Sequence, residues 1–210
     1  MEEFITISNT STAEIVEKKS KFIANVYYVE NKEEAEKKIK EIKKKYNDAR
    51  HNCYAYRVIT EDTLFEKFSD DGEPSGTAGS PMLNILQKNS ICNVVVIVTR
   101  YFGGILLGTG GLLRAYSDSA NKALELAEKI EVERGIIAQI SLAYKDLELF
   151  KYYCKNQNIN IIKIDYEEEI KILIELSTKQ EENLQQNKDE FKFKMLNCRI
   201  MSKKYIRKIR

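Results

Sequence analysis

Apolar and polar positions follow two different periods in the first half of the chain. Residues 4–30 alternate loosely around the polar turn 8–12, with a second turn at 18–21, and predict short antiparallel strands. After Asn31, a favourable helix N-cap, apolar residues recur at spacings of three and four and predict an amphipathic helix over 32–46. Further strands are expected at 58–59 and 64–68, and a helix at about 80–87.

The most continuous apolar run lies near the middle of the chain. Val94–Val98 predicts a strand buried on both faces, because neither side of its pleat carries a polar side chain. An Arg-Tyr-Phe cluster follows, and then five of the nine glycines, which permit positive φ and close approach of the backbone. Apolar and small residues at helical spacing predict a helix over 112–127 that packs on the sheet.

The pattern changes after residue 135. Strands are expected at 136–143, 159–164, 170–176 and 191–200, and helices at 147–156 and 179–188. This βαββαβ order is the ferredoxin-like plan, in which two helices cover one face of a four-stranded antiparallel sheet. A chain of 210 residues can bury two cores, so we expect an N-terminal domain of residues 1–132 and a C-terminal domain of residues 133–210.

Composition narrows the functional classes. With 34 basic and 32 acidic residues, the net charge of +2 gives no argument for nucleic acid from the whole molecule, so any basic surface must be local. The sequence shows neither a signal peptide nor a spanning helix, which predicts a cytoplasmic protein without a membrane partner. The four cysteines stand far apart without a Cys-x-x-Cys pair, so we expect reduced thiols, no structural metal and no cofactor.

Two basic segments have competing interpretations. The lysines of the 32–46 helix are interleaved with glutamates, which favours a solvated helix face over an RNA-binding one. Five cations in the last nine residues are suited to phosphate and equally to a solvated terminus: Lys203, Lys204, Arg207, Lys208 and Arg210.

The glycine cluster suggests an anion site. Glycines that lead into a helix N-terminus direct free N–H groups and the positive end of the helix dipole at an anion, here between Arg100 and Arg114. The third glycine of a dinucleotide fingerprint and the Gly-Lys-Ser/Thr of a P-loop are both missing. A general anion site at Gly108–Gly111 and a tight strand-to-helix connection therefore stay open as alternatives.

An acidic loop and a lone histidine are the other candidates for chemistry. Asp70, Asp71 and Glu73 suit magnesium or acid–base work, but Asp-Gly and Glu-Pro favour a turn unless the loop lies opposite the arginines. His51 is the only histidine, and we favour a structural role because no nucleophile stands beside it. Cys53 shares a strand face with His51 but lacks an evident third group.

Three segments together resemble a known family. Residues 48–56 (DARHNCYAY), 69–81 (SDDGEPSGTAGSP) and 99–116 (TRYFGGILLGTGGLLRAY) are similar to the three signature segments of the YigZ/IMPACT family, in the bacterial two-domain form. The resemblance covers about residues 15–127. It implies an α+β protein: an N-terminal α/β domain resembling the second domain of a small-subunit ribosomal protein, and a ferredoxin-like C-terminal domain resembling one of elongation factor G.

The resemblance also implies a function. The family's eukaryotic members are translational regulators that restrain an amino-acid-starvation kinase by occupying its ribosome-bound activator. The likeness of both domains to parts of the translation machinery suggests RNA or ribosome contact, by analogy. One departure matters, because family members usually have lysine where this chain has Leu106, and the missing cation weakens phosphate binding by the loop.

We therefore expect a non-enzymatic, translation-associated protein that contacts RNA, the ribosome or a translation-related protein, without sequence-specific DNA binding. The expected contact residues are Arg50, His51, Arg100, Tyr101, Gly103, Gly104, Gly108, Gly110, Gly111 and Arg114. The role of the motif loop Asp70, Asp71, Gly72, Glu73 and Pro74 stays open.

Two alternatives stay open. One is a hydrolase or phosphotransferase that uses Asp70, Asp71 and Glu73 with His51 and Arg100, provided that these residues share one concave pocket. The other places the binding surface on the C-terminal sheet, with residues 203–210 at its margin.

Overall fold

The chain forms two compact units. The computed structural model describes residues 3–60, 63–186 and 191–208, and the contacts divide it into residues 3–130 and 131–210. Strand β7 (Lys129–Leu142) begins in the first unit and continues into the second, so a strand rather than a loop connects them. Within the described ranges, every helix is too short or too polar to span a membrane.

The first unit is built on a five-stranded antiparallel sheet. Its strands, in spatial order, are β2 (Ser11–Glu17), β3 (Ser20–Tyr28), β6 (Val94–Tyr101), β4 (His51–Thr60) and β5 (Thr63–Ser69). The short strand β1 (Glu3–Ile7) bonds to the chain at Ser90 and Cys92. Residues Val94–Val98 of the central strand are fully buried. A continuous apolar run thus marks a doubly covered strand here, although the sheet is antiparallel.

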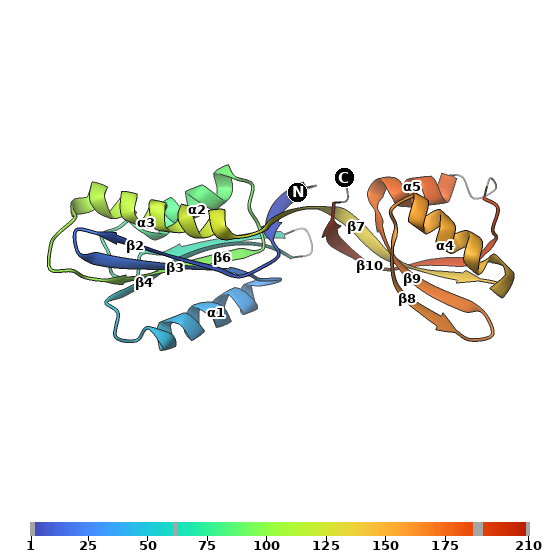
Figure 1. Ribbon diagram of the computed structural model, residues 1–210, viewed down its shortest axis with the longest axis horizontal. Coiled ribbons are helices and arrows are strands. Elements are labelled where there is room, and N and C mark those ends of the chain that lie inside the picture. Colours follow the sequence, from blue (N-terminus) through green and yellow to red (C-terminus); the bar gives the residue numbers. More distant parts are fainter. Residues whose placement is uncertain (1–2, 61–62, 187–190, 209–210) are drawn as a thin grey trace. The chain divides into compact units, whose positions relative to one another are not determined.

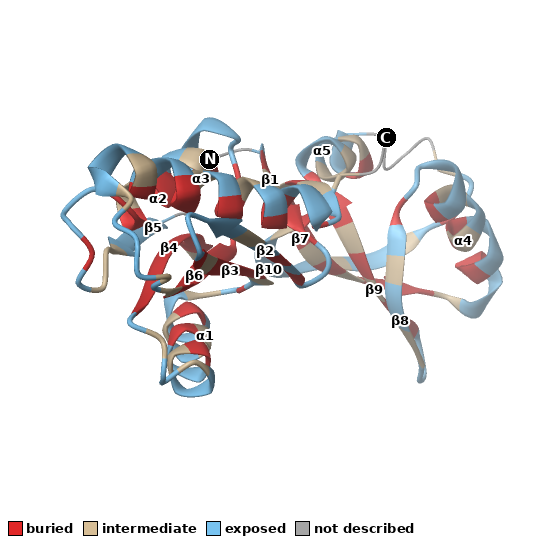
Figure 2. Cartoon of the chain, turned by 60° about the vertical axis from the view of Figure 1, so that its left-hand side comes forward, coloured by how far each residue is buried: buried red, intermediate tan, exposed pale blue. Residues whose placement is uncertain are grey.

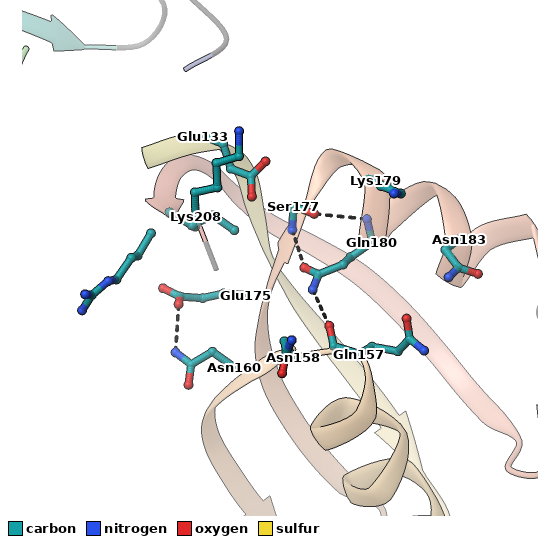
Figure 3. Close-up of a pocket in the computed structure, with 12 residues that line it drawn as sticks. Glu133, Gln157, Asn158, Asn160, Glu175, Ser177, Lys179, Gln180, Asn183 and Lys208 are labelled. Carbon is teal, nitrogen blue, oxygen red and sulfur yellow. Dashed lines mark hydrogen bonds between the residues drawn. The ribbon is translucent and has the colours of Figure 1, made fainter. Parts of the chain in front are cut away.

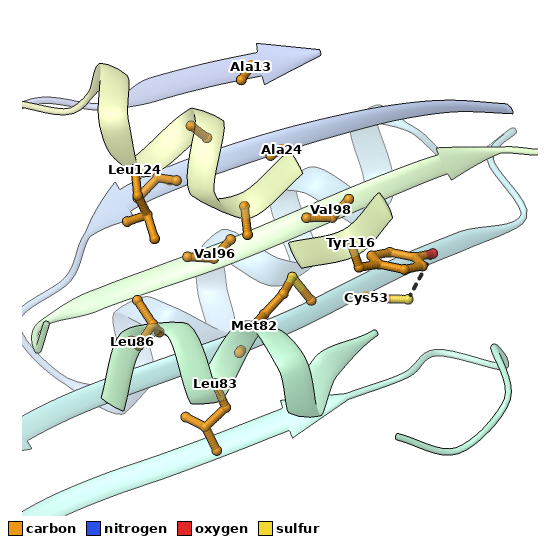
Figure 4. Close-up of a cluster of buried hydrophobic side chains, with 14 of the residues drawn as sticks. Ala13, Ala24, Cys53, Met82, Leu83, Leu86, Val96, Val98, Tyr116 and Leu124 are labelled. Atoms are coloured by element: carbon orange, nitrogen blue, oxygen red, sulfur yellow. Dashed lines mark hydrogen bonds between the residues drawn. The ribbon is translucent and has the colours of Figure 1, made fainter. Parts of the chain in front are cut away.

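Helices cover both faces of this sheet (Figure 1). Helix α1 (Lys32–Lys45) lies on one face, while α2 (Gly79–Lys88) and α3 (Gly108–Leu126) lie on the other. Asn31 caps α1 by accepting a hydrogen bond from the Glu34 N–H. Figure 2 shows that the buried residues of each helix line the side that meets the sheet. The larger core, between the sheet and α2 and α3, holds Met82, Val96 and Tyr116 (Figure 4).

The second unit has the ferredoxin-like fold that the sequence predicts. Its elements after β7 are a 3₁₀ turn (Tyr144–Asp146), α4 (Leu147–Asn156), β8 (Asn160–Tyr166), β9 (Ile170–Ser177), α5 (Thr178–Gln186) and β10 (Met195–Arg207). The antiparallel pairing gives the order β10-β7-β9-β8, which is the order of a split βαβ sheet. Helices α4 and α5 cover one face over a core of isoleucines from β7 and β9.

Several element boundaries differ from the predictions, among them the starts of β7 at Lys129 rather than 136 and of β10 at Met195 rather than 191. Strand β4 begins at His51 rather than at residue 58, because the polar side chains at its start find partners inside the protein. Helix α3 begins at Gly108 rather than at 112, so three of the glycines form its first turn. Strand β10 continues to Arg207, because residues 202–207 pair with the start of β7. The basic tail is therefore largely strand; Lys188 and Arg210 lie outside the described residues.

Candidate functional site

The three signature segments meet at one end of the first sheet. Strands β4 and β6 are neighbours, and their register places His51 opposite Arg100. The acidic loop follows β5, whose last residue Ser69 pairs with Tyr54 of β4. Tyr116, on α3, reaches the same place from the helical layer. The sheet topology thus brings together motifs that are separated by tens of residues in sequence.

Asp70 closes the acidic loop and caps the following helix. Its carboxylate accepts hydrogen bonds from the backbone N–H groups of Gly76, Ala78 and Gly79, at 2.8–3.0 Å. A negative charge at the first turn of α2 also interacts favourably with the helix dipole. Gly79 is needed here, because a Cβ would lie 2.8 Å from the Ser69 backbone. Asp70 therefore acts as a turn and cap residue.

Asp71 fixes the loop against the start of β4. Its carboxylate accepts from the Asn52 N–H at 2.7 Å and pairs with Lys43 of α1 at 2.6 Å. The Nδ1 of His51 lies 2.8 Å from the Asp71 carbonyl oxygen. Since a carbonyl oxygen only accepts, Nδ1 carries a hydrogen and donates it to this oxygen.

Glu73 is the centre of a buried polar cluster. One carboxylate oxygen, Oε1, accepts from Arg100 Nη1 at 2.7 Å and from the Tyr116 hydroxyl at 2.8 Å. The Nε2 of His51 lies 3.9 Å from the same oxygen. The Glu73 and Arg100 side chains are only 3% and 6% exposed. A buried ion pair of this kind is costly to break, because either partner alone would leave an uncompensated charge.

Cys53 completes this inner cluster, which we define as His51, Cys53, Glu73, Arg100 and Tyr116. Its thiol donates to the Asp70 carbonyl and lies 3.3 Å from the Tyr116 hydroxyl (Figure 4). Burial raises the pKa of the Cys53 thiol well above its usual range, and burial likewise raises the pKa of the Tyr116 phenol. Both groups therefore stay protonated, which is unfavourable for a thiolate nucleophile.

Arg100 is enclosed by aromatic rings and by the β2–β3 turn. Its guanidinium lies 5.5 Å from the ring centroids of both Phe22 and Phe102. The hydroxyl of Ser20 lies 3.4 Å from Arg100 Nη2 and accepts from the Gly103 N–H. A Cβ on Gly103 would lie 2.0 Å from the Lys19 carbonyl carbon, so only glycine fits.

An exposed rim surrounds the inner cluster, and we define it as Lys18, Arg50, Tyr101, Arg114 and the loop 102–108. Arg50 and Arg114 are exposed, and Tyr101 is half-buried with its hydroxyl bonded to Asp48 at 2.8 Å. The loop exposes three large apolar side chains: Phe102, Ile105 and Leu106, with Leu106 at 83%.

A small pocket lies beside the rim at the start of α3. It measures about 290 Å³, and its lining includes Lys18, Arg114 and Gly111 together with Asp118. The N-cap residue of α3, Leu107, makes no side-chain hydrogen bond to the helix, and the first turn contains no acidic residue. The cations of the pocket thus stand near an uncapped helix N-terminus.

Sequence comparison identifies the family. The model of the Impact N-terminal domain matches residues 18–124, and that of a domain of unknown function (DUF1949) matches residues 140–187. An IMPACT family member of Haemophilus influenzae is 38% identical over 181 residues, which are 85% of this chain and 87% of that protein. The chain belongs to the IMPACT family. YvyE of Bacillus subtilis, another member, is 39% identical over 81% of this chain and 78% of its own length.

The IMPACT family relationship extends to the fold. A crystal structure of a hypothetical protein superposes with a TM-score of 0.63 at 31% identity, covering 87% of this chain and 89% of that one. A relative from Dictyostelium discoideum, named a protein IMPACT homolog, is 41% identical over 97 residues, which are 45% of this chain and 28% of that protein. The family resemblance of the three motifs is confirmed.

The IMPACT motif residues divide into two groups. His51, Arg100 and Glu73 come together as the enzyme alternative requires, but their side chains pack against one another. Among the described residues, groups of three or more metal-binding side chains with suitable placement are absent. Arg50, Tyr101 and Arg114 remain on the surface, as do Gly104, Gly108 and Gly110. Gly104 and Gly108 adopt positive φ.

The inner cluster and its immediate surroundings contain residues that we did not single out from the sequence. Tyr116 was noted only as a core position of the helix, and Ser20 and Lys43 only as parts of a turn and of a charged helix. Tyr116 ends the third signature segment, so its place in the motif was the available signal. Ser20 and Lys43 lie outside all three motifs and carry no comparable signal.

Proposed function

We propose that this IMPACT family member is a translation-associated binding protein that contacts the ribosome through the rim of its first unit. Family membership and the resemblance to translational regulators support the translational role. The observation that carries the proposal is the rim itself, where exposed apolar side chains of residues 102–106 stand beside the cations Lys18, Arg50 and Arg114. The buried inner cluster holds this surface from beneath.

The strand ends place the rim cations along one edge. Arg50 precedes β4, Tyr101 ends β6 opposite Lys21 of β3, and Lys18 lies in the adjoining β2–β3 turn. Arginine offers planar, bidentate donors to phosphate, and the accessible part of the half-buried Tyr101 ring offers a surface on which a base can stack. These residues therefore suit contact with ribosomal RNA.

The enzyme alternative receives less support from the geometry. Asp70 and Asp71 are used for capping and pairing, and Glu73 balances Arg100. The pocket at the start of α3 is lined by Lys18, Arg114 and neighbouring residues, and the acidic loop does not contribute to it. We therefore assign the acidic loop a structural role, in keeping with the turn interpretation.

Co-sedimentation with ribosomes at two salt concentrations tests the proposal. The double variant Arg50→Ala/Arg114→Ala should weaken binding and reduce the salt dependence by about two phosphate contacts. Lys37→Ala/Lys40→Ala removes two exposed cations from α1 and is the charge-matched control. Unchanged binding by the arginine variant would overturn the proposed surface, and equal weakening by the control would show charge attraction without a site.

The exposed apolar side chains favour a second candidate, a ribosome-bound protein as the partner. Phe102, Ile105 and Leu106 have no role in the core of this unit. A protein contact at these residues would show weak salt dependence, because burial of apolar surface is not screened by ions. Leu106→Ser should then weaken co-sedimentation at high salt, where the phosphate contacts contribute least.

A further inference from the structure

The second unit contains a polar pocket of its own. The ribosome contact proposed for the rim of the first unit assigns no role to this pocket. It measures about 400 Å³ and lies where β7 and β8 begin and where β9 and β10 end (Figure 3). That volume is within the range of small-molecule sites. All of its lining residues belong to the second unit, which matches a domain of unknown function.

Carboxamide side chains dominate one wall of the pocket. Gln157, Asn158, Asn160 and Gln180 all line the pocket, and Figure 3 shows Gln180 bonded to the Gln157 backbone and Asn160 bonded to Glu175. Gln180 is held on both sides, since its Oε1 accepts from the Ser177 N–H and its Nε2 donates to the Gln157 carbonyl. This fixed amide anchors the wall, while the side chains of Gln157 and Asn158 are exposed to solvent.

Two acidic residues, Glu133 and Glu175, line the pocket, and the charge of Glu175 is already balanced. Glu175 accepts from Asn160 at 2.8 Å and pairs with Lys204 at 2.6 Å. Desolvation opposes ionisation, but the hydrogen bonds from Lys204 and Asn160 outweigh it and lower the pKa of Glu175. Asn160 donates its amide nitrogen to Glu175, so its amide oxygen is not used in this hydrogen bond.

Cations also line the pocket. Lys179 and Arg207 are exposed lining residues, and β10 carries Lys203, Lys204 and Arg207, of which Lys204 is paired with Glu175. Lys203 and Arg207 lie on one face of the strand, where two cations can contact phosphates of a single nucleic acid strand. The pocket therefore combines uncharged donors and acceptors with the carboxylate of Glu133 and with adjacent positive charge.

We propose that this pocket binds an unpaired nucleotide of single-stranded RNA. Carboxamides present a donor and an acceptor side by side, which matches the edge of a nucleobase. That edge is accessible only in an unpaired base, while Arg207 and Lys179 are placed to contact its phosphate. A peptide could also form hydrogen bonds with these carboxamide side chains. The cations of β10, however, favour a ligand with repeated negative charge.

Fluorescence anisotropy with short labelled RNAs tests this site on the full chain. Single-stranded homopolymers of A, C and U should bind with unequal affinity, and a duplex of the same length should bind more weakly. Inorganic polyphosphate serves as the competitor that reveals attraction by charge alone. Because naked RNA is the probe, the result does not depend on ribosome binding by the rim, and either proposal can fail without the other.

Two amide variants test the contact with the base. Asn158 has φ of +52°, so Asn158→Gly removes the amide without backbone strain. Gln157→Ala is the second variant, with Asn156→Ala, on the same helix but outside the pocket, as its matched control. Each amide variant should reduce the difference in affinity among the three homopolymers by about fivefold or more. This factor is the lower end of the discrimination that one bidentate contact to a base provides. The control should leave the difference unchanged.

Arg207→Ala tests the phosphate contact, and Arg199→Ala on the same strand is its control. Arg207→Ala should weaken all three homopolymers equally and reduce the salt slope by about 1, whereas Arg199→Ala should not. Equal affinity for all homopolymers, unchanged by Asn158→Gly and Gln157→Ala, would overturn the proposal. So would complete displacement by polyphosphate, or the absence of RNA binding.

Discussion

The inner cluster and the rim, apart from Lys18, come from the same three motifs but differ in burial and in charge pairing. Glu73 and Arg100 are buried and satisfy each other, whereas Arg50 and Arg114 are exposed to solvent. The residues of the inner cluster are far apart in sequence and are brought together by the register of the strands. The residues of the rim lie at strand ends and in the glycine loop. A motif residue with a charged side chain can therefore serve stability or binding, and its burial decides which.

The contrast changes how the arginines are interpreted. Arg100 and Arg114 flank the glycine loop in sequence and seem equivalent there. In the structure, Arg100 is a structural cation whose charge is balanced by Glu73, and only Arg114 is available to a ligand. Arg50, which is also among the expected contact residues, remains in the proposed binding surface.

Removal of the buried carboxylate should give the largest loss of stability. Glu73→Gln leaves the Arg100 charge buried without its counter-ion, which should cost about 3–5 kcal/mol of unfolding free energy. Lys43→Met is the control, because it breaks a partly exposed pair with Asp71 and should cost about 1 kcal/mol or less. Hydrogen exchange of the β4 and β6 amides measures the loss of stability in both variants. Equal losses would show that the buried ion pair is no more important than the partly exposed one.

The glycine loop offers the next test. Gly103→Ala places a Cβ against the Lys19 backbone, so the loop must shift, at a cost of about 1–3 kcal/mol or more. Gly110→Ala, in the first turn of α3 with open space around it, should instead stabilise by about 0.5–1 kcal/mol. Thermal unfolding of the two variants measures the difference. A destabilised Gly110→Ala variant would contradict this account of the loop.

The sequence predicted the regular elements better than the inner cluster. The α1 helix and the ferredoxin-like order follow from apolar periodicity, which depends on nearby residues alone. The early start of β4 was missed, because His51 and Asn52 are polar yet find buried partners in the Asp71 carbonyl and Thr99. Such partners are set by long-range strand register, and periodicity within one segment does not reveal them.

Alkaline pH should destabilise the first unit through the buried thiol of the inner cluster. Burial raises the pKa of the Cys53 thiol, so the folded state holds this proton more tightly than the unfolded state. The contribution to stability is complete below about pH 8.5, the ordinary value of a thiol, and decreases as the pH rises above it. Urea titrations at several pH values measure the slope, and Cys53→Ala should reduce it.

Thiol alkylation gives an independent measure of the same cluster. Cys53 is buried and should react with iodoacetamide only when the first unit opens, whereas the partly exposed Cys198 in the second unit should react sooner. In Glu73→Gln, the reaction at Cys53 should accelerate and that at Cys198 should not. Rapid alkylation of Cys53 in the unaltered protein would contradict a closed inner cluster.

The smallest effect on stability is expected at Leu106, where the consequence should appear in binding instead. Leu106→Lys replaces an 83% exposed side chain, so the unfolding free energy should change by no more than about 0.5 kcal/mol. If the loop lies against ribosomal RNA, the new cation adds a phosphate contact, so co-sedimentation should strengthen at low salt with a slope steeper by about 1. Weaker binding at every salt concentration would instead show that the leucine itself is buried in the contact, which favours the protein partner.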